Sequence, residues 1–338
     1  MNQNHKLNPS SSNPVNTHIG SASFFGFPDV FGSCGKSLIF WALGVLLLPF
    51  ALMGAETRGI WWYSARGDSW GAEQVLGDSV REAEVIHFLQ EWNIGQVYCG
   101  FNARLRGKVP LLRAWNTKLH AAGRSSQLLL DENTWIYPQH RAKLLALHIQ
   151  HDLIDFNATA ANPRQRYDAL HLDIEPQGLP EWKTLSPAGR KELLFMLRDT
   201  FQQVRLYLNQ HGAADISVYA DLPVWYDQVP EPVGWSSIAE RDDWFADLGK
   251  SLAGISLMAY EQKTPGSMEN KVGWEVQNFK GEVRIGLKAS IGAGKTWNSL
   301  GDFVAMIQTQ EAAKPLRKVD IFDLIQFHAA TGMVSAVK

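Results

Sequence analysis

The stretch DALHLDIE, residues 168–175, carries the strongest fold information in this chain of 338 residues. Side chains alternate across a β-strand, so His171, Asp173 and Glu175 share one face and the leucines and the isoleucine share the other. A strand covered on both sides normally reads as a continuous apolar run, and an unpaired buried charge is costly. The stretch therefore predicts a buried strand whose polar face performs chemistry, with a structural network of ion pairs as the alternative.

Eight β-rich runs alternate with amphipathic helical patterns between residues 56 and 338, and no low-complexity linker divides them. Eight such units in one domain fit a (β/α)8 TIM barrel, an α/β fold of typically about 250 residues. The eighth helix is expected to be short or missing, since few residues follow the last predicted strand. The predicted strands are 59–64, 95–101, 127–130, 169–175, 216–220, 254–260, 283–288 and 323–328.

Polar and aromatic residues stand at the carboxyl ends of these predicted strands. Barrel enzymes place their active sites at that face, so we expect the side chains to line one pocket. Thirteen tryptophans suit a carbohydrate site, where sugar rings stack on indoles, although most will belong to the core. Only one of the adjacent Trp61 and Trp62 can face the barrel interior. The expected substrate-binding residues are His171, Asp221, Glu261, Trp61, Trp62, Asp131, Trp225, Gln326 and His328.

Two motifs resemble family 18 glycoside hydrolases, the chitinases and endo-β-N-acetylglucosaminidases. Residues 168–175 are similar to the family's Asp-Gly-apolar-Asp-apolar-Asp-x-Glu strand, and Leu257-Met-Ala-Tyr260-Glu261 is similar to its Met-x-Tyr-Asp. The resemblance implies hydrolysis of β-glycosidic bonds in an N-acetylated glycan, with Glu175 as general acid. It also implies that Asp173 and Tyr260 hold the substrate's acetamide, whose carbonyl oxygen is the nucleophile. A raised pKa on one carboxyl beside a second, ionised one is what such chemistry requires.

The chain departs from the family pattern at several positions. His171 stands where the family has an Asp, Ala169 replaces a Gly, and Phe327-His328 occupies the expected place of a Trp. A non-hydrolytic carbohydrate-binding barrel is therefore one alternative. Glu175-Pro176 also resembles the fourth strand of retaining glycosidases that use two carboxylates, but Lys288-Ala-Ser lies where their nucleophilic Glu would be.

The N-terminus contains a membrane signal. Residues 1–36 form a polar leader rich in Asn, Ser, Pro and Gly, and the uncharged stretch 37–55 fits a signal peptide or an N-terminal membrane anchor. Either interpretation predicts an exported barrel: periplasmic, extracellular or anchored facing away from the cytoplasm. Cys34 and Cys99 lie on opposite sides of this stretch, so no disulfide framework is available.

Composition and motifs narrow the choice of partners. A net charge of −2 makes nucleic acid an unlikely partner class, which leaves an oligosaccharide or polysaccharide and, for an uncleaved anchor, the membrane. Residues 289–296 loosely match a phosphate-binding loop, but a glycine-rich turn after the seventh strand explains the same letters. No histidine spacing implies a metal, and no cofactor is expected.

Overall fold

The computed structural model describes residues 58–335. The predicted leader, residues 1–36, and the predicted signal or anchor, residues 37–55, lie outside these described residues. Within the described part of the chain, no helix is both long and apolar enough to cross a membrane.

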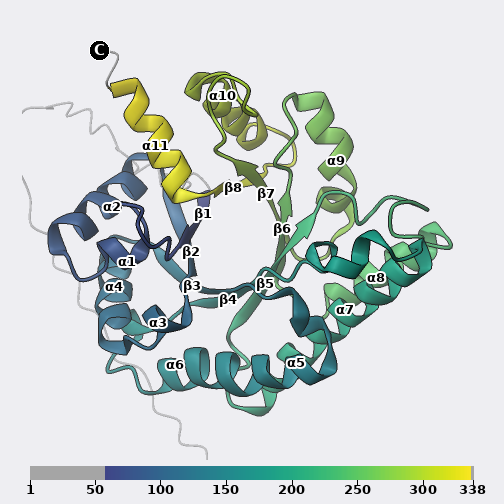
Figure 1. Cartoon of the computed structure of the whole chain (residues 1–338), viewed down its shortest axis with the longest axis horizontal. Coiled ribbons are helices and arrows are strands. Elements are labelled where there is room, and N and C mark those ends of the chain that lie inside the picture. Colours follow the sequence, from purple (N-terminus) through teal and green to yellow (C-terminus); the bar gives the residue numbers. More distant parts are fainter. Residues whose placement is uncertain (1–57, 336–338) are drawn as a thin grey trace, which may run out of the picture. The chain divides into compact units, whose positions relative to one another are not determined.

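Eight parallel strands close into a barrel in the order in which they occur in the chain, and helices surround it (Figure 1). The strands are β1 (Arg58–Tyr63), β2 (Ile94–Gly100), β3 (Ser125–Leu130), β4 (Ala169–Leu172), β5 (Ser217–Pro223), β6 (Gly254–Met258), β7 (Glu282–Lys288) and β8 (Lys318–Phe322). The predicted (β/α)8 barrel is confirmed. Its strands differ from the predicted ones by a few residues at their ends, except for the eighth.

The α-helices that surround the barrel are α1 (Ala72–Val75), α2 (Ser79–Glu91), α3 (Ala103–Arg106), α4 (Val109–Ala121), α5 (Pro138–Lys143), α6 (Phe156–Ala158), α7 (Pro187–Gln210), α8 (Ile238–Leu248), α9 (Pro265–Asn278), α10 (Leu300–Glu311) and α11 (Leu324–Ser335). A π-helical stretch, Leu144–Asp155, joins α5 to α6. The start of α7 follows the sequence signals, because Ser186 caps it and Pro187 opens its first turn.

The two faces of β4 separate as the alternation predicts. Leu170 and Leu172 are fully buried in the main hydrophobic core between strands and helices. His171 points into the barrel, where its ring lies 4.2 Å from that of Tyr98 and 6.0 Å from that of Trp61. The barrel interior is thus partly polar, and each polar group in it needs a partner.

Asp320 of β8 accepts hydrogen bonds from three side chains inside the barrel. It accepts hydrogen bonds from Arg284 Nε at 2.7 Å, Tyr98 Oη at 2.9 Å and Ser256 Oγ at 2.6 Å. Gly59 of β1 leaves the room for this cluster, because a Cβ there would lie 2.3 Å from Asp320 Oδ1 and 2.2 Å from Tyr98 Oη. The cluster ties β1, β2, β6, β7 and β8 together at one level of the barrel.

Removing the Asp320 carboxylate is expected to destabilise the barrel. Asp320 and Arg284 are almost completely buried, and the loss of one partner of a buried ion pair costs about 3–5 kcal/mol. Asp320→Ala should therefore lower the free energy of unfolding by that amount in urea denaturation. Lys250→Ala is the control, because its ion pair with Asp247 is exposed, and a change below about 1 kcal/mol is expected. Equal effects of the two substitutions would contradict this account.

The predicted eighth strand, residues 323–328, is wrong. The strand lies five residues earlier. The apolar residues after it belong to α11, the helix of twelve residues that follows β8 and is drawn in yellow in Figure 1. Charged residues concealed the strand, because Lys318 pairs with Glu282 at 2.9 Å and Asp320 pairs with Arg284.

This shift also corrects two expected site residues. Gln326 lies in α11, where its Nε2 donates to Asp323 Oδ2 at 2.8 Å. His328, on the same helix, stacks on Trp70 with 3.4 Å between ring centroids and lines a groove with residues of α2. Neither residue ends a strand.

Candidate active site

A cavity of about 420 Å³ opens at the carboxyl ends of the strands. The residues that follow β4, β5 and β6 form most of its wall, and the last residues of β1 and β8 complete it. All three residues expected to be catalytic, Asp173, Glu175 and Tyr260, line it. It is located where barrel enzymes carry their active sites.

Glu175 lies in the loop just after β4, two residues beyond Asp173. Its backbone N–H donates to Asn133 Oδ1 at 2.7 Å, and its Oε2 accepts a hydrogen bond from Gln177 Nε2. Tyr226 Oη in turn donates to Gln177 Oε1 at 2.5 Å. Burial raises the pKa of Glu175, whereas the bond from Gln177 lowers it. A carboxyl with a raised pKa in a cavity is suited to donate a proton.

Asp173 lines the same cavity, and one of its carboxylate oxygens lacks a partner. Its Oδ1 is buried and has no hydrogen-bond partner among the described residues. Burial raises the pKa of Asp173 well above its usual range, and the nearby charges of Asp221, Glu175 and Asp131 add to that rise. A buried acceptor without a partner is rare in proteins, and a ligand N–H would satisfy it.

Asp221 of β5 belongs to a chain of hydrogen bonds inside the barrel, and its charge acts on Asp173. Gln127 Nε2 donates to Gln96 Oε1 at 3.0 Å, which leaves Gln127 Oε1 to accept from His171 Nδ1 at 3.2 Å. Burial lowers the pKa of His171 to about 3, so the imidazole is neutral and carries one proton. With that proton on Nδ1, His171 Nε2 accepts from Asp221 Oδ1 at 2.8 Å.

These hydrogen bonds therefore require that Asp221 is protonated and neutral. Its second oxygen accepts a hydrogen bond from Trp61 Nε1 at 3.0 Å, and burial raises the pKa of Asp221 well above its usual range. Two neighbouring buried carboxyls do not both ionise readily. A neutral Asp221 therefore removes one cause of the raised pKa of Asp173 and leaves the negative charge to Asp173.

Aromatic rings form another wall of the cavity. Phe322, the last residue of β8, lies 5.0 Å from the ring of Tyr260 and 5.9 Å from the ring of Tyr63. Burial, together with the charges of Asp221 and Asp173, raises the pKa of Tyr260 well above its usual range. Tyr260 is thus a neutral O–H donor beside the two carboxyls, and the rings offer an apolar face for a sugar.

Five of the nine expected substrate-binding residues lie at or near the cavity, in three groups. Glu261 and Trp225 line the cavity together with the three expected catalytic residues. Asp131 is exposed at the end of β3, from where its charge acts on Asp173. His171 and Asp221 are about 1% exposed and support the site from below.

Trp61 and Trp62 do not reach the cavity. Trp61 faces the barrel interior and is fully buried there. Trp62 faces the helices, with its ring 5.0 Å from that of Trp115, and donates to the carbonyl oxygen of Trp70. One of the pair faces inward, as predicted, but both are core residues, so the expectation that they bind substrate is corrected.

Eight residues that line the cavity are missing from the sequence-based set, and three of them carry a polar group or a ring that bears on the site. Gln177 lies two residues after Glu175 and could have been found as a neighbour of the predicted acid. Phe322 was hidden by the error in the eighth strand. Lys271 lines the cavity from helix α9, and a search for polar residues at the ends of strands does not find a residue on a helix.

No protein-family model and no curated protein matches this chain. The glycoside hydrolase domain of PgaB (BpsB) from Bordetella bronchiseptica is similar in structure, with a TM-score of 0.51 and 13% identity over 83% of this chain and 98% of that one. A mutant class V chitinase from Cycas revoluta, in complex with (GlcNAc)3, gives 0.48 and 10% identity over 83% and 99%. The SleL spore cortex-lytic enzyme of Bacillus megaterium gives 0.48 and 11% over 80% and 72%.

These likenesses concern the fold. The chain is a (β/α)8 barrel of the kind found in glycoside hydrolase domains, with buried carboxyls at the carboxyl ends of its strands. The predicted resemblance is confirmed at the level of the fold.

Proposed function

We propose that this protein hydrolyses β-glycosidic bonds in an N-acetylated glycan, with the substrate's own acetamide as nucleophile. The observation that carries the proposal is the meeting of Asp173, Glu175 and Tyr260 in one cavity, where burial raises the pKa of Glu175, the proposed proton donor. Glycoside hydrolysis needs an acid for the leaving oxygen and a charge that stabilises the reacting sugar.

Each side chain has a separate part in the proposed reaction. Glu175 donates its proton to the glycosidic oxygen as the bond to the anomeric carbon breaks. The acetamide oxygen bonds to that carbon, and the ionised Asp173 accepts a hydrogen bond from the acetamide N–H, which becomes more acidic. Tyr260 donates a hydrogen bond to the same acetamide. Water then attacks the anomeric carbon, the bond from that carbon to the acetamide oxygen breaks, and the proton released by the water goes to the Glu175 carboxylate.

The network below Asp173 supports this division of roles. In this chain a histidine occupies the second polar position of the motif 168–175, and Asp221 of β5 contacts it. The neutral Asp221 and His171 keep Asp173 as the charged partner for the acetamide. A chromogenic N,N′-diacetylchitobioside tests the proposal directly, since release of its leaving group by the full chain is expected.

The pH profile of this reaction is expected to depend on Gln177. Activity requires protonated Glu175, so it falls as the pH rises through the pKa of that residue. Gln177 donates to the ionised form and holds this pKa down. Gln177→Ala should therefore raise the pKa of Glu175 and move the alkaline limb of kcat/KM to higher pH.

Gln262→Ala is the matched control, because Gln262 lines the same cavity but makes no hydrogen bond to Glu175. Its alkaline limb should stay in place. A Gln177→Ala limb that stays in place or moves to lower pH would rule out Glu175 as the titrating acid.

A further inference from the structure

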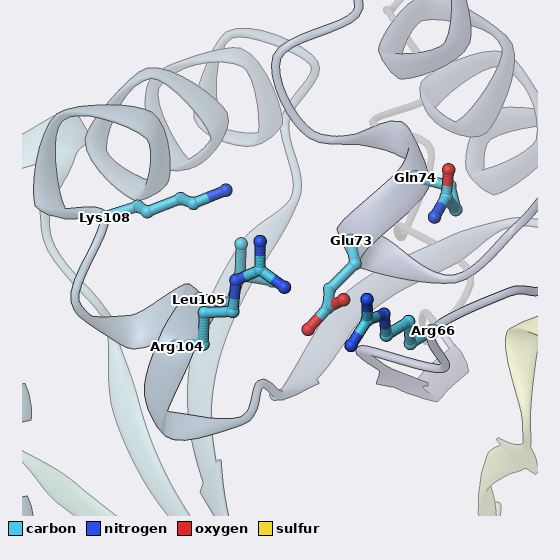
Figure 2. Close-up of a pocket in the computed structure, with 6 residues that line it drawn as sticks. All are labelled: Arg66, Glu73, Gln74, Arg104, Leu105 and Lys108. Carbon is cyan, nitrogen blue, oxygen red and sulfur yellow. The ribbon is translucent and has the colours of Figure 1, made fainter.

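A second pocket, of about 210 Å³, lies between the loops that follow β1 and β2. Three cationic side chains, Arg66, Arg104 and Lys108, line it together with one carboxylate, Glu73, which gives it a net charge of +2. Figure 2 shows the two guanidinium groups on either side of the Glu73 carboxylate, with Lys108 reaching in from the start of α4. The whole chain has a net charge of −2, so this pocket is not part of a generally basic protein.

The three cations have no partner among the described residues: no hydrogen bond or ion pair engages their charged groups. Arg106, two residues from Arg104 on α3, gives the contrast. It pairs with Asp152 at 2.8 Å and donates to the carbonyl oxygen of Phe101. One arginine of this short helix is thus used for structure, and the other is left facing the pocket.

The frame of the pocket is fixed before any ligand binds. Asn102 caps α3 through a hydrogen bond from Leu105 N at 3.0 Å, and its side chain donates to Glu73 Oε1 at 2.6 Å. The Asn102 backbone N–H donates to Ser64 Oγ at 2.9 Å, which ties the loop after β2 to the loop after β1. The loops that carry the cationic side chains therefore need little ordering when a ligand binds.

The loop after β1 connects the pocket to the catalytic cavity. Tyr63, which lines that cavity, is three residues before Arg66, so their Cα atoms are at most about 11 Å apart. The ring of Tyr63 packs on Gly100, the last residue of β2, because a Cβ there would meet it at 2.6 Å. A glycan chain that extends from the cavity past Tyr63 would therefore run towards the loop that carries Arg66.

We propose that this pocket binds an anionic group, a carboxylate or a sulfate, on a sugar next to the one that is cleaved. Guanidinium groups match such oxyanions in geometry and form bidentate hydrogen bonds with them. The proposal rests on the proposed function and narrows its substrate class to N-acetylated glycans that carry acidic groups.

The test compares two tetrasaccharides of equal length by calorimetry, in the Glu175→Gln background so that neither is cleaved. One alternates N-acetylglucosamine with glucuronate, and the other is neutral chitotetraose. The acidic one should bind more tightly, with a preference that decreases as salt is added. Arg104→Gln should reduce that preference about two- to fivefold, because Arg104 is exposed and exposed ion pairs are weak. Lys143→Gln, the same charge change on exposed α5, should leave it unaltered.

Two further arms make the outcomes decisive. A sulfated neutral-backbone tetrasaccharide distinguishes sulfate from carboxylate as the preferred anion. Inorganic sulfate, titrated into the full chain and observed by NMR of the arginine side chains, probes the pocket whether or not any glycan is hydrolysed. Equal affinity for acidic and neutral chains, or equal effects of Arg104→Gln and Lys143→Gln, would overturn the proposal. Sulfate binding at Arg104 without hydrolysis of any glycan would instead contradict the proposed function alone.

Discussion

Replacing Glu175 by Gln is expected to lower kcat by about 10²- to 10⁴-fold, the usual contribution of general acid catalysis. The substitution keeps the size of the side chain and the backbone bond to Asn133, but it removes the proton that the leaving oxygen needs. Hydrolysis of the chromogenic chitobioside by wild type and variant gives the measurement. Glu261→Gln is the matched control in the same cavity and should have a much smaller effect.

Substrates with different leaving groups show whether Glu175 acts as an acid or only supports the structure. A dinitrophenolate leaves without protonation, so the deficit of Glu175→Gln should shrink on a dinitrophenyl substrate. A deficit of the same size on both substrates would show that Glu175 does not act as the acid. Binding of chitotetraose by the wild type without any turnover would favour a non-hydrolytic carbohydrate-binding barrel.

Asp173→Asn is expected to lower kcat by about 10²- to 10³-fold, as the loss of one preorganised electrostatic group does. The buried Oδ1 of Asp173 has no hydrogen-bond partner within residues 58–335, and an amide in place of the carboxylate cannot supply the negative charge that the acetamide N–H requires as it becomes more acidic. Steady-state kinetics on the chitobioside, with circular dichroism as a check of folding, measure the effect.

Asp131→Asn provides the comparison for Asp173. Asp131 contributes charge from an exposed position at the strand end, so its replacement should change kcat far less. Comparable losses of kcat in the two variants would mean that the combined negative charge around the cavity matters. A direct contact between Asp173 and the acetamide would then be contradicted.

The strands and the central carboxyls of the site were predictable because their signals are local. On β4, Leu170 and Leu172 alternate with the polar residues, and Asp173 and Glu175 follow two residues apart. Strand β8 was missed because its inward side chains are charged. Lys318 and Asp320 look like surface residues until Glu282 and Arg284 are placed beside them on the neighbouring strand β7.

The hydrogen bonds that support the site could not be predicted, because they join segments that are far apart in the sequence. His171 meets Asp221, 50 residues away, and Gln177 meets Tyr226, 49 residues away. The burial of Trp61 beneath the cavity depends on its bond to Asp221, on another strand. Alternation predicts which way a side chain points, but the depth at which it ends depends on the whole barrel.

The requirement for a substrate acetamide is the most direct test of the central claim. The same chromogenic leaving group is placed on chitobiose and on cellobiose, which lacks both acetamides, and kcat/KM of the full chain is measured on each. Substrate assistance predicts release from the chitobioside and none detectable from the cellobioside. Comparable release from both would show that the protein supplies its own nucleophile, and would contradict the reaction proposed for Asp173 and Glu175.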